Sequence, residues 1–204
     1  MVEKKGANKR LDKKAKYETI LKSAVKVFAK NGFHNSTISE IAKAAGVADG
    51  TIYLYFRNKD DILIRLFEDR MDAAIGEFKK TLGNVDDPVI RLEIFISRYI
   101  EYMEKRRALA EVISVELRQS HKFMKEYVPV KFAEFLNLLS EIVKDGIKKG
   151  IFHSDIKPEI VKRAIFGALD EMVLYWVLTP KPKYTPVEIA DNLKTMVIEG
   201  LRTR

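Results

Sequence analysis

The stretch from Ser36 to Phe56, STISEIAKAAGVADGTIYLYF, constrains the fold of this chain most strongly. Small and apolar residues recur there at the spacing of one helix face, at Ile38, Ile41, Ala42 and Ala45. Gly46 follows the last of them, at a place where a left-handed residue ends a helix with little steric cost. The pattern predicts a helix that stops at a glycine turn.

Capping signals mark where this helix and the next one begin. Thr37 is an N-cap candidate, with Ser36 as an alternative, and Glu40 is placed to complete a capping box. Asp49 is a second N-cap candidate, which predicts a short helix over 50–56. Two short helices joined by a tight turn form a helix-turn-helix over 37–56, whose second helix fits the DNA major groove. Asp49-Gly50 is also a hairpin signal, but the flanking residues have helical rather than alternating periodicity.

The outer side of the second helix carries Thr51, Tyr53 and Tyr55, whose hydroxyl groups suit contacts to phosphates and bases. The alternative is an ordinary helical hairpin of a bundle. The helix has no Arg, Asn or Gln before Arg57 to read a base edge directly. If this helix binds DNA, the choice of DNA sequence is therefore expected to rest partly on Thr51, apolar contacts and DNA shape.

The distribution of charge favours nucleic acid as the partner of the N-terminal part. The net charge is +8 over 204 residues, and residues 1–60 hold 13 Lys/Arg against 6 Asp/Glu. A basic module on a nearly neutral body is the electrostatic pattern of a phosphate binder. A basic tail that serves only solubility or membrane contact is the alternative.

The composition is that of a globular protein with a substantial core. Hydrophobic residues make up 47% of the chain, and there is no Cys, which excludes disulfides and cysteine metal sites. No secretory signal and no apolar run of membrane-spanning length are evident. We therefore expect a cytoplasmic protein without a membrane partner.

The periodicity along the rest of the chain predicts an all-α protein. Residues 1–12 are expected to form a basic, disordered arm and residues 13–60 a three-helix head. Beyond the head, the predicted helices span about 59–82, 88–104, 109–118, 130–149, 158–178 and 186–202, with a helix that Pro129 interrupts begun near Gln119.

The sequence shows no catalytic or metal-binding constellation. His34, His121 and His153 are far apart, and no metal-binding histidine motif, glycine-rich phosphate loop or G-x-S-x-G occurs. We therefore expect a protein that is not an enzyme and that has no metal and no cofactor.

The segment TISEIAKAAGVADGTIYLYFRNKDDIL, preceded by FAKNGFHNST, resembles the signature of TetR-family transcriptional regulators. The resemblance covers about residues 14–74 and implies a TetR-like fold of about nine helices. It also implies that residues 61–204 form the effector-binding and dimerisation domain. By this resemblance the operator contacts are Thr37, Gly50, Thr51, Tyr53, Tyr55 and Lys59. Glycine lets the backbone approach a phosphate, and helix N-termini offer free N–H groups to anions.

Three further segments are similar to one branch of that family, the repressors of fatty-acid degradation in Gram-positive bacteria. They are GVADGTIYLYFRNKDDIL, VELRQS at 115–120 and FGALDEMVLYWVL at 166–178. The resemblance implies a repressor of fatty-acid degradation genes that binds a pseudo-palindromic operator as a dimer. It implies long-chain acyl-CoA as the effector that releases the DNA.

The effector is expected among the helices that follow the head. The candidates for an acyl tunnel are Phe95, Tyr99, Tyr102, Met103, Phe132, Phe135, Leu136, Phe166 and Trp176. Arginine binds phosphate with two parallel hydrogen bonds, which makes Arg98, Arg106, Arg107 and Arg118 candidates for the CoA phosphates. Each of these residues has an ordinary alternative, as core for the apolar ones and as solvated surface for the arginines.

The two C-terminal helices, 158–178 and 186–202, are more apolar than one core face requires. In the family such a pair forms the homodimer interface, which places two heads about 34 Å apart on DNA. Burial within a single core is the alternative.

Two other functions fit parts of the sequence. One is a repressor of the same architecture that controls a drug-efflux gene and answers an aromatic or cationic molecule. The other is an acyl-CoA or lipid carrier whose DNA binding is vestigial.

Overall fold

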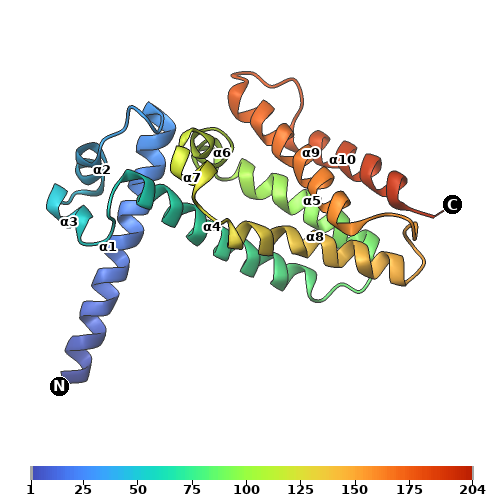
Figure 1. The fold of residues 1–204 in the computed structure, drawn as a ribbon, viewed down its shortest axis with the longest axis horizontal. Helices are drawn as coiled ribbons and strands as arrows, with labels where there is room; N and C mark the ends of the chain where they lie inside the picture. The colour runs from blue at the N-terminus through green and yellow to red at the C-terminus, as the bar shows by residue number, and fades with distance from the viewer. Residues whose placement is uncertain (1, 204) are drawn as a thin grey trace. The chain divides into compact units, whose positions relative to one another are not determined.

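The computed structural model describes residues 2–203, with side chains from residue 12 onward. Every regular element in this part of the chain is helical, which confirms the predicted all-α class. Figure 1 shows the helices α1 Val2–Asn31, α2 Ile38–Ala45, α3 Asp49–Tyr53, α4 Lys59–Leu82, α5 Pro88–Glu104, α6 Arg107–Ser114, α7 His121–Lys125, α8 Val130–Lys148, α9 Pro158–Leu178 and α10 Pro186–Leu201. A short 3₁₀ helix, η1, spans Glu116–Gln119 between α6 and α7.

The chain folds into two compact units, and each unit combines segments that are not consecutive in sequence. The head contains the residues up to Phe67 and also Val115–Tyr127. The second unit contains Glu68–Ser114 and the residues from Val128 onward. The helix α4 therefore begins in the head and ends in the second unit, and the segment 115–127 belongs to the head although its neighbours in sequence do not.

In the head, α2 packs against α1, and α3 packs against α2 (Figure 1). Its core consists of fully buried apolar side chains from these helices and from the start of α4, namely Ile20, Leu21, Ala24, Phe28, Ile41, Ala42, Ile52, Phe56, Ile62 and Leu63. Of the four periodic positions predicted for α2, Ile41 and Ala42 belong to this core, and Ile38 and Ala45 are half-buried.

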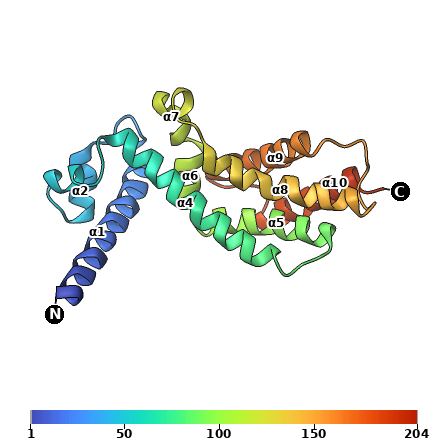
Figure 2. The same cartoon turned by 60° about the horizontal axis from the view of Figure 1, so that its bottom comes forward.

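The second unit is a bundle in which α5 packs on α8, α9 and α10, as Figure 2 shows. At its end, the Phe152 side chain is buried against Gly146 of α8, and Phe152 forms an isolated antiparallel bridge with Arg202. A Cβ added at Gly146 would lie 2.0 Å from Cδ2 of the Phe152 ring, so only glycine leaves room for this ring.

Most predicted helix ends agree with the structure. Thr37 and Glu40 form the predicted capping box, and Gly46 has the left-handed φ of 67°. Asp87 caps α5, whose first residue is Pro88, and Asn58 Oδ1 accepts the Asp61 N–H in the first turn of α4 at 2.9 Å.

Three local predictions differ from the structure. α1 has helical backbone from Val2, where a disordered arm over 1–12 was predicted; the side chains of residues 1–11 lie outside the described residues. Ala48, not Asp49, occupies the N-cap of α3, and α3 ends at Tyr53 instead of residue 56. An acid in the first turn is still favourable there because of the helix dipole. The helix predicted over 109–118 ends at Ser114, and η1 follows it.

Candidate functional site

The outer face of α3 presents hydroxyl groups and open backbone to the solvent. Tyr53 is 60% exposed, and Thr51 is half-buried. No atom lies within 4 Å of a Cβ built on Gly50, so the backbone is open to a ligand at that position. This face has the groups that contact the sugar-phosphate backbone of DNA.

Leu54 is the most exposed large apolar residue of the head, with 76% of its surface accessible. It directly follows the last residue of α3, between the two predicted tyrosine contacts. An exposed apolar side chain next to Tyr53 suits contact with a thymine methyl group in the major groove. The sequence analysis missed Leu54 because the segment IYLYF does not reveal which of its apolar residues are buried.

Tyr55 is held by aromatic neighbours from α1 and from its own segment. Its ring centroid lies 6.4 Å from that of Tyr17 and 6.3 Å from that of Phe56, and Tyr17 stacks on Phe56 at 5.2 Å. The Lys13 ammonium lies 5.9 Å from the Tyr55 centroid. This cluster orients the predicted contact Tyr55 and places a cation beside it, which the sequence analysis did not anticipate.

Thr37 has its hydroxyl group engaged within the capping box of α2. Thr37 Oγ1 donates to Glu40 Oε2 at 2.9 Å and accepts the Glu40 N–H at 3.2 Å. The Thr37 backbone N–H donates to the same carboxylate at 2.8 Å. These bonds lower the pKa of Glu40, first through the backbone N–H of Thr37 and then through its hydroxyl group.

Lys59 holds the loop between α1 and α2. Its ammonium donates to three carbonyl oxygens of this loop, those of Phe33 at 2.5 Å, His34 at 2.9 Å and Ser36 at 2.9 Å. It also lies 4.6 Å from the centroid of the Phe33 ring. Burial lowers the pKa of Lys59. An ammonium group has three N–H donors, and in Lys59 all three are bonded to carbonyl oxygens of the loop.

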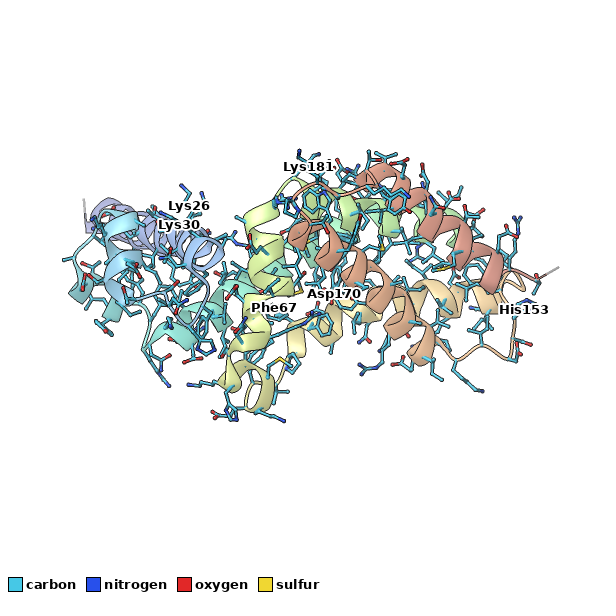
Figure 3. The ribbon with its side chains drawn as sticks, turned by 90° about the horizontal axis from the view of Figure 1, so that it is seen from above. Lys26, Lys30, Phe67, His153, Asp170 and Lys181 are labelled. Atoms are coloured by element: carbon cyan, nitrogen blue, oxygen red, sulfur yellow. The ribbon has the colours of Figure 1, made fainter. Side chains whose placement is uncertain are left out.

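Further basic side chains lie exposed on α1. Lys26 and Lys30 project from this helix into the solvent, as Figure 3 shows. They are four residues apart and therefore share one helix face. They contribute to the positive charge of the head.

In the second unit, five of the nine predicted tunnel residues form one aromatic cluster. The centroids of Phe95 and Phe135 are 5.4 Å apart, and Tyr99 lies 6.2 Å from Phe135. Phe166 lies 5.8 Å from Tyr99 and 4.8 Å from Phe132, so the chain of rings extends from α5 through α8 to α9.

Phe78 of α4 completes this cluster. Its centroid lies 4.8 Å from that of Phe95 and 5.2 Å from that of Phe135. The sequence analysis did not include Phe78 among the effector residues. Its helical spacing marked it only as buried, and spacing alone does not show which other helix a buried face meets.

The other predicted tunnel residues lie around this cluster or apart from it. Leu136 and Met103 are buried. Met103 and Trp176 line the same small pocket, together with residues of α10. Tyr102 is also buried, and burial raises the pKa of its hydroxyl group.

The four predicted phosphate ligands have different surroundings. Arg98 donates to Glu101 at 2.8 Å. The guanidinium of Arg106 lies 3.9 Å from the Tyr102 ring centroid.

Arg107 donates to the Val177 carbonyl oxygen at 3.0 Å and lies 4.5 Å from the centroid of the Trp176 ring. Arg118 is exposed on η1 and belongs to the head, unlike the other three arginines. The structure therefore places Arg106 and Arg107 against aromatic rings at the junction of α5 and α6, and it divides the set of four between the two units.

Asp170, which the sequence places in the apolar part of α9, is half-buried (Figure 3). Ser114 Oγ donates to its Oδ1 at 3.5 Å. Among residues 12–203, no group of His, Asp and Glu side chains has the arrangement of a metal site. No helix in the same range is both long and apolar enough to cross a membrane.

Two family models match consecutive parts of the chain. Residues 20–66 match the model of the bacterial regulatory proteins of the tetR family. Residues 67–200 match the model described as the C-terminal region of YsiA-like proteins. The chain belongs to the TetR family of bacterial transcriptional regulators. The resemblance read from the signature around Gly46 is thus confirmed, together with the fold that it implies.

Members of this family with known roles are similar over almost the whole chain. The fatty acid metabolism regulator protein of Bacillus subtilis is 35% identical over 192 residues, which cover 94% of this chain and 98% of the relative. The crystal structure of the regulator FadR from Bacillus subtilis in complex with stearoyl-CoA has a TM-score of 0.84 and 36% identity, and the match covers 90% of this chain and 98% of that one. The fatty acid degradation regulator FadR of Bacillus halodurans has a TM-score of 0.83 and 36% identity, with 91% and 100% covered.

Proposed function

We propose that this protein represses fatty-acid degradation genes and that long-chain acyl-CoA releases it from its operator. The observation that carries the proposal is the match, at 36% identity over 90% of the chain, to a regulator whose structure contains stearoyl-CoA. The protein acts in the cytoplasm as a regulator and not as an enzyme.

The aromatic cluster of the second unit supports an acyl ligand. Its rings come from α4, α5, α8 and α9, so an alkyl chain inserted among them would contact four helices of the effector domain at once. Burial of each methylene group contributes about 0.8 kcal/mol, which favours long chains. Arg106 and Arg107 supply positive charge at the end of α5 and the start of α6 for the phosphates of CoA.

The face of α9 and α10 supports assembly of the protein as a homodimer. Large apolar side chains of these helices and of the loop between them are exposed in the single chain, namely Ile160, Leu178, Tyr184 and Met196. A groove lined by Met172, Tyr184 and Met196 runs between these two helices. Exposed apolar side chains beside a groove are typical of a protein interface, and a two-fold dimer would present two heads to a pseudo-palindromic operator.

The test is release of operator DNA in a fluorescence anisotropy assay at fixed salt. The DNA is a fragment from upstream of the protein's own gene or of a neighbouring fatty-acid degradation operon. The titrants are palmitoyl-CoA, palmitate and CoA. We expect release by palmitoyl-CoA and not by palmitate or CoA alone.

The same assay separates the alternatives. Release by an aromatic or cationic drug, with no response to palmitoyl-CoA, would support a repressor of an efflux gene. Binding of palmitoyl-CoA by a protein without tight, salt-dependent DNA binding would support a carrier function.

A further inference from the structure

The loop between α1 and α2, residues 32–37, sets the start of the helix that precedes α3. Ser36 Oγ donates to the Gly32 carbonyl oxygen at 2.6 Å, and Thr37 provides the N-cap of α2. Lys59 binds three of the loop's carbonyl groups, as described above. The conformation of this loop therefore determines the position of α2 and, through the turn at Gly46, the position of α3.

Glu116 of η1 binds the same loop through a backbone N–H group of the loop. The Phe33 backbone N–H donates to Glu116 Oε2 at 2.6 Å, although the two residues are 83 positions apart. Only 9% of the Glu116 surface is exposed. A buried carboxylate is costly unless it is hydrogen-bonded, so this bond contributes to holding the loop and η1 together. Gly32 passes close to the same carboxylate, with its built Cβ position 3.5 Å from Oε2.

The segment 115–127 has two more attachments within the head, both to α4. Ser120 Oγ donates to Asp60 Oδ1 at 2.7 Å, directly beside Lys59. Phe123 packs edge-on against Phe67 of α4 with centroids 5.1 Å apart. The carboxylate of Glu116 is therefore carried by a segment that is fixed to the head at three places.

Both ends of this segment continue into helices of the second unit, which is the proposed effector unit. The segment 115–127 follows α6 directly, and the residues after it lead into α8. α6 carries Arg107, and α8 carries Phe132 and Phe135 of the aromatic cluster. A ligand that changes the spacing of α6 and α8 must pull on the two ends of a 13-residue segment whose anchors lie in the head.

We infer that Glu116 is a positioning residue for operator binding. Its carboxylate holds the 32–37 loop in the conformation that binds DNA, and the segment 115–127 is a second link, besides α4, from the effector unit to the head. This inference rests on the proposed function. Effector binding weakens the bond between Glu116 and Phe33, and with it the presentation of α2 and α3.

The test compares three variants with the wild type. Glu116→Leu removes the acceptor and keeps an apolar side chain of similar length. Glu116→Gln keeps one oxygen that can accept the Phe33 N–H. Glu126→Gln, at an exposed position of the same segment, is the matched control. Operator affinity is measured without effector and with saturating palmitoyl-CoA, and exchange of the Phe33 amide hydrogen is measured by NMR.

Without effector, Glu116→Leu should lower operator affinity about tenfold or more, and Phe33 amide exchange should accelerate. Glu116→Gln and Glu126→Gln should stay within about threefold of the wild type. With saturating palmitoyl-CoA, Glu116→Leu should change affinity less than about twofold, because the bond is already weakened there.

Two results would overturn the inference. Unchanged operator affinity in Glu116→Leu removes the positioning role. An equal loss of affinity with and without palmitoyl-CoA means that the contact is merely structural and carries no effector response.

A second variant that keeps Glu116 tests the same link if Glu116→Leu does not fold. Ser120→Ala removes the bond to Asp60 and also the N-cap of α7, in which Ser120 Oγ accepts the Phe123 N–H at 3.1 Å. Both changes loosen the segment 115–127, so this variant should show the same pattern with a smaller loss, while an unchanged affinity contradicts the link. If wild-type protein binds its operator but palmitoyl-CoA does not release it, the proposed function fails. The effector-free comparison of Glu116→Leu with Glu116→Gln still decides the positioning role in that case.

Discussion

At the scale of single residues, the head combines exposed contact groups with groups that are committed to holding its loops. Tyr53 and Leu54 are free to meet DNA, whereas Lys59 uses its three donors on loop carbonyls. The family resemblance implies an operator contact for Lys59. The bonds of its ammonium show that its removal also leaves three acceptors without their partner.

Substitution of Lys59 by Met should therefore lower the free energy of unfolding by about 1–3 kcal/mol, because the loop carbonyl groups lose a charged donor. Operator affinity should fall, and if Lys59 acts only by holding the loop, the slope of log K against log salt should stay unchanged. Urea denaturation and a salt titration check both parts. Lys26→Met, at an exposed position of α1, is the control; a slope reduced by about 1 in Lys59→Met would instead indicate a direct phosphate contact.

The recognition face allows a second prediction at this scale. Leu54→Ala should weaken operator binding by about 1–3 kcal/mol if its side chain meets a thymine methyl group, and it should leave folding stability nearly unchanged because Leu54 is exposed. Competition between the operator and a variant fragment without the thymine measures this effect. Equal losses on both fragments would exclude base-specific contact by Leu54.

At the scale of the helices, local hydrogen bonds determine where α2 begins. The pKa of Glu40 lies below its reference value of 4.5, through the N–H and then the hydroxyl group of Thr37. A lowered carboxyl pKa means that the capping box stabilises the fold above pH 4.5 and loses this contribution as pH falls through the folded-state pKa. An NMR titration should show the low pKa in the wild type and a value nearer 4.5 in Thr37→Val. A pKa unaffected by this substitution would contradict the assignment of its cause.

A glycine in α8 tests packing between elements. Gly146→Ala should destabilise the second unit by about 1–3 kcal/mol, because its methyl group would overlap the buried Phe152 ring. Gly76→Ala, at an exposed and open position of α4, should instead stabilise by about 0.5–1 kcal/mol through helix propensity. Urea denaturation compares the two. Similar effects of both substitutions would show that Phe152 does not depend on the glycine.

At the scale of the whole molecule, the proposed dimer depends on the apolar face of α9 and α10. Met196 is 59% exposed in the single chain. In a two-fold dimer both protomers contribute the same surface, so one substitution changes the interface at two places. Met196→Glu should shift the protein to monomers in light scattering and abolish tight operator binding, because a charge buried at an apolar interface costs several kcal/mol. Ile90→Glu, at an exposed apolar position of α5, should remain dimeric. A dimeric Met196→Glu would place the interface elsewhere.

The sequence by itself determined the family, the helices and most of their ends. Capping residues, prolines and the glycine after α2 act through bonds to neighbours within a few positions, so their effect is visible in the order of residues. For the same reason, the periodic apolar positions identified most of the core. Five of the nine predicted tunnel residues meet in one aromatic cluster, because each helix buries the face that its periodicity marks.

Tertiary structure decided which of these faces and segments meet. Only the fold places Phe78 beside Phe95, occupies the donors of Lys59 with a loop, and attaches Glu116 to Phe33 across 83 positions. Periodicity shows that a side chain is buried but not which residues surround it. The sequence around a polar residue also does not identify a hydrogen-bond partner that lies far away in the chain. The membership of 115–127 in the head is therefore a property of long-range contacts, which the local pattern cannot contain.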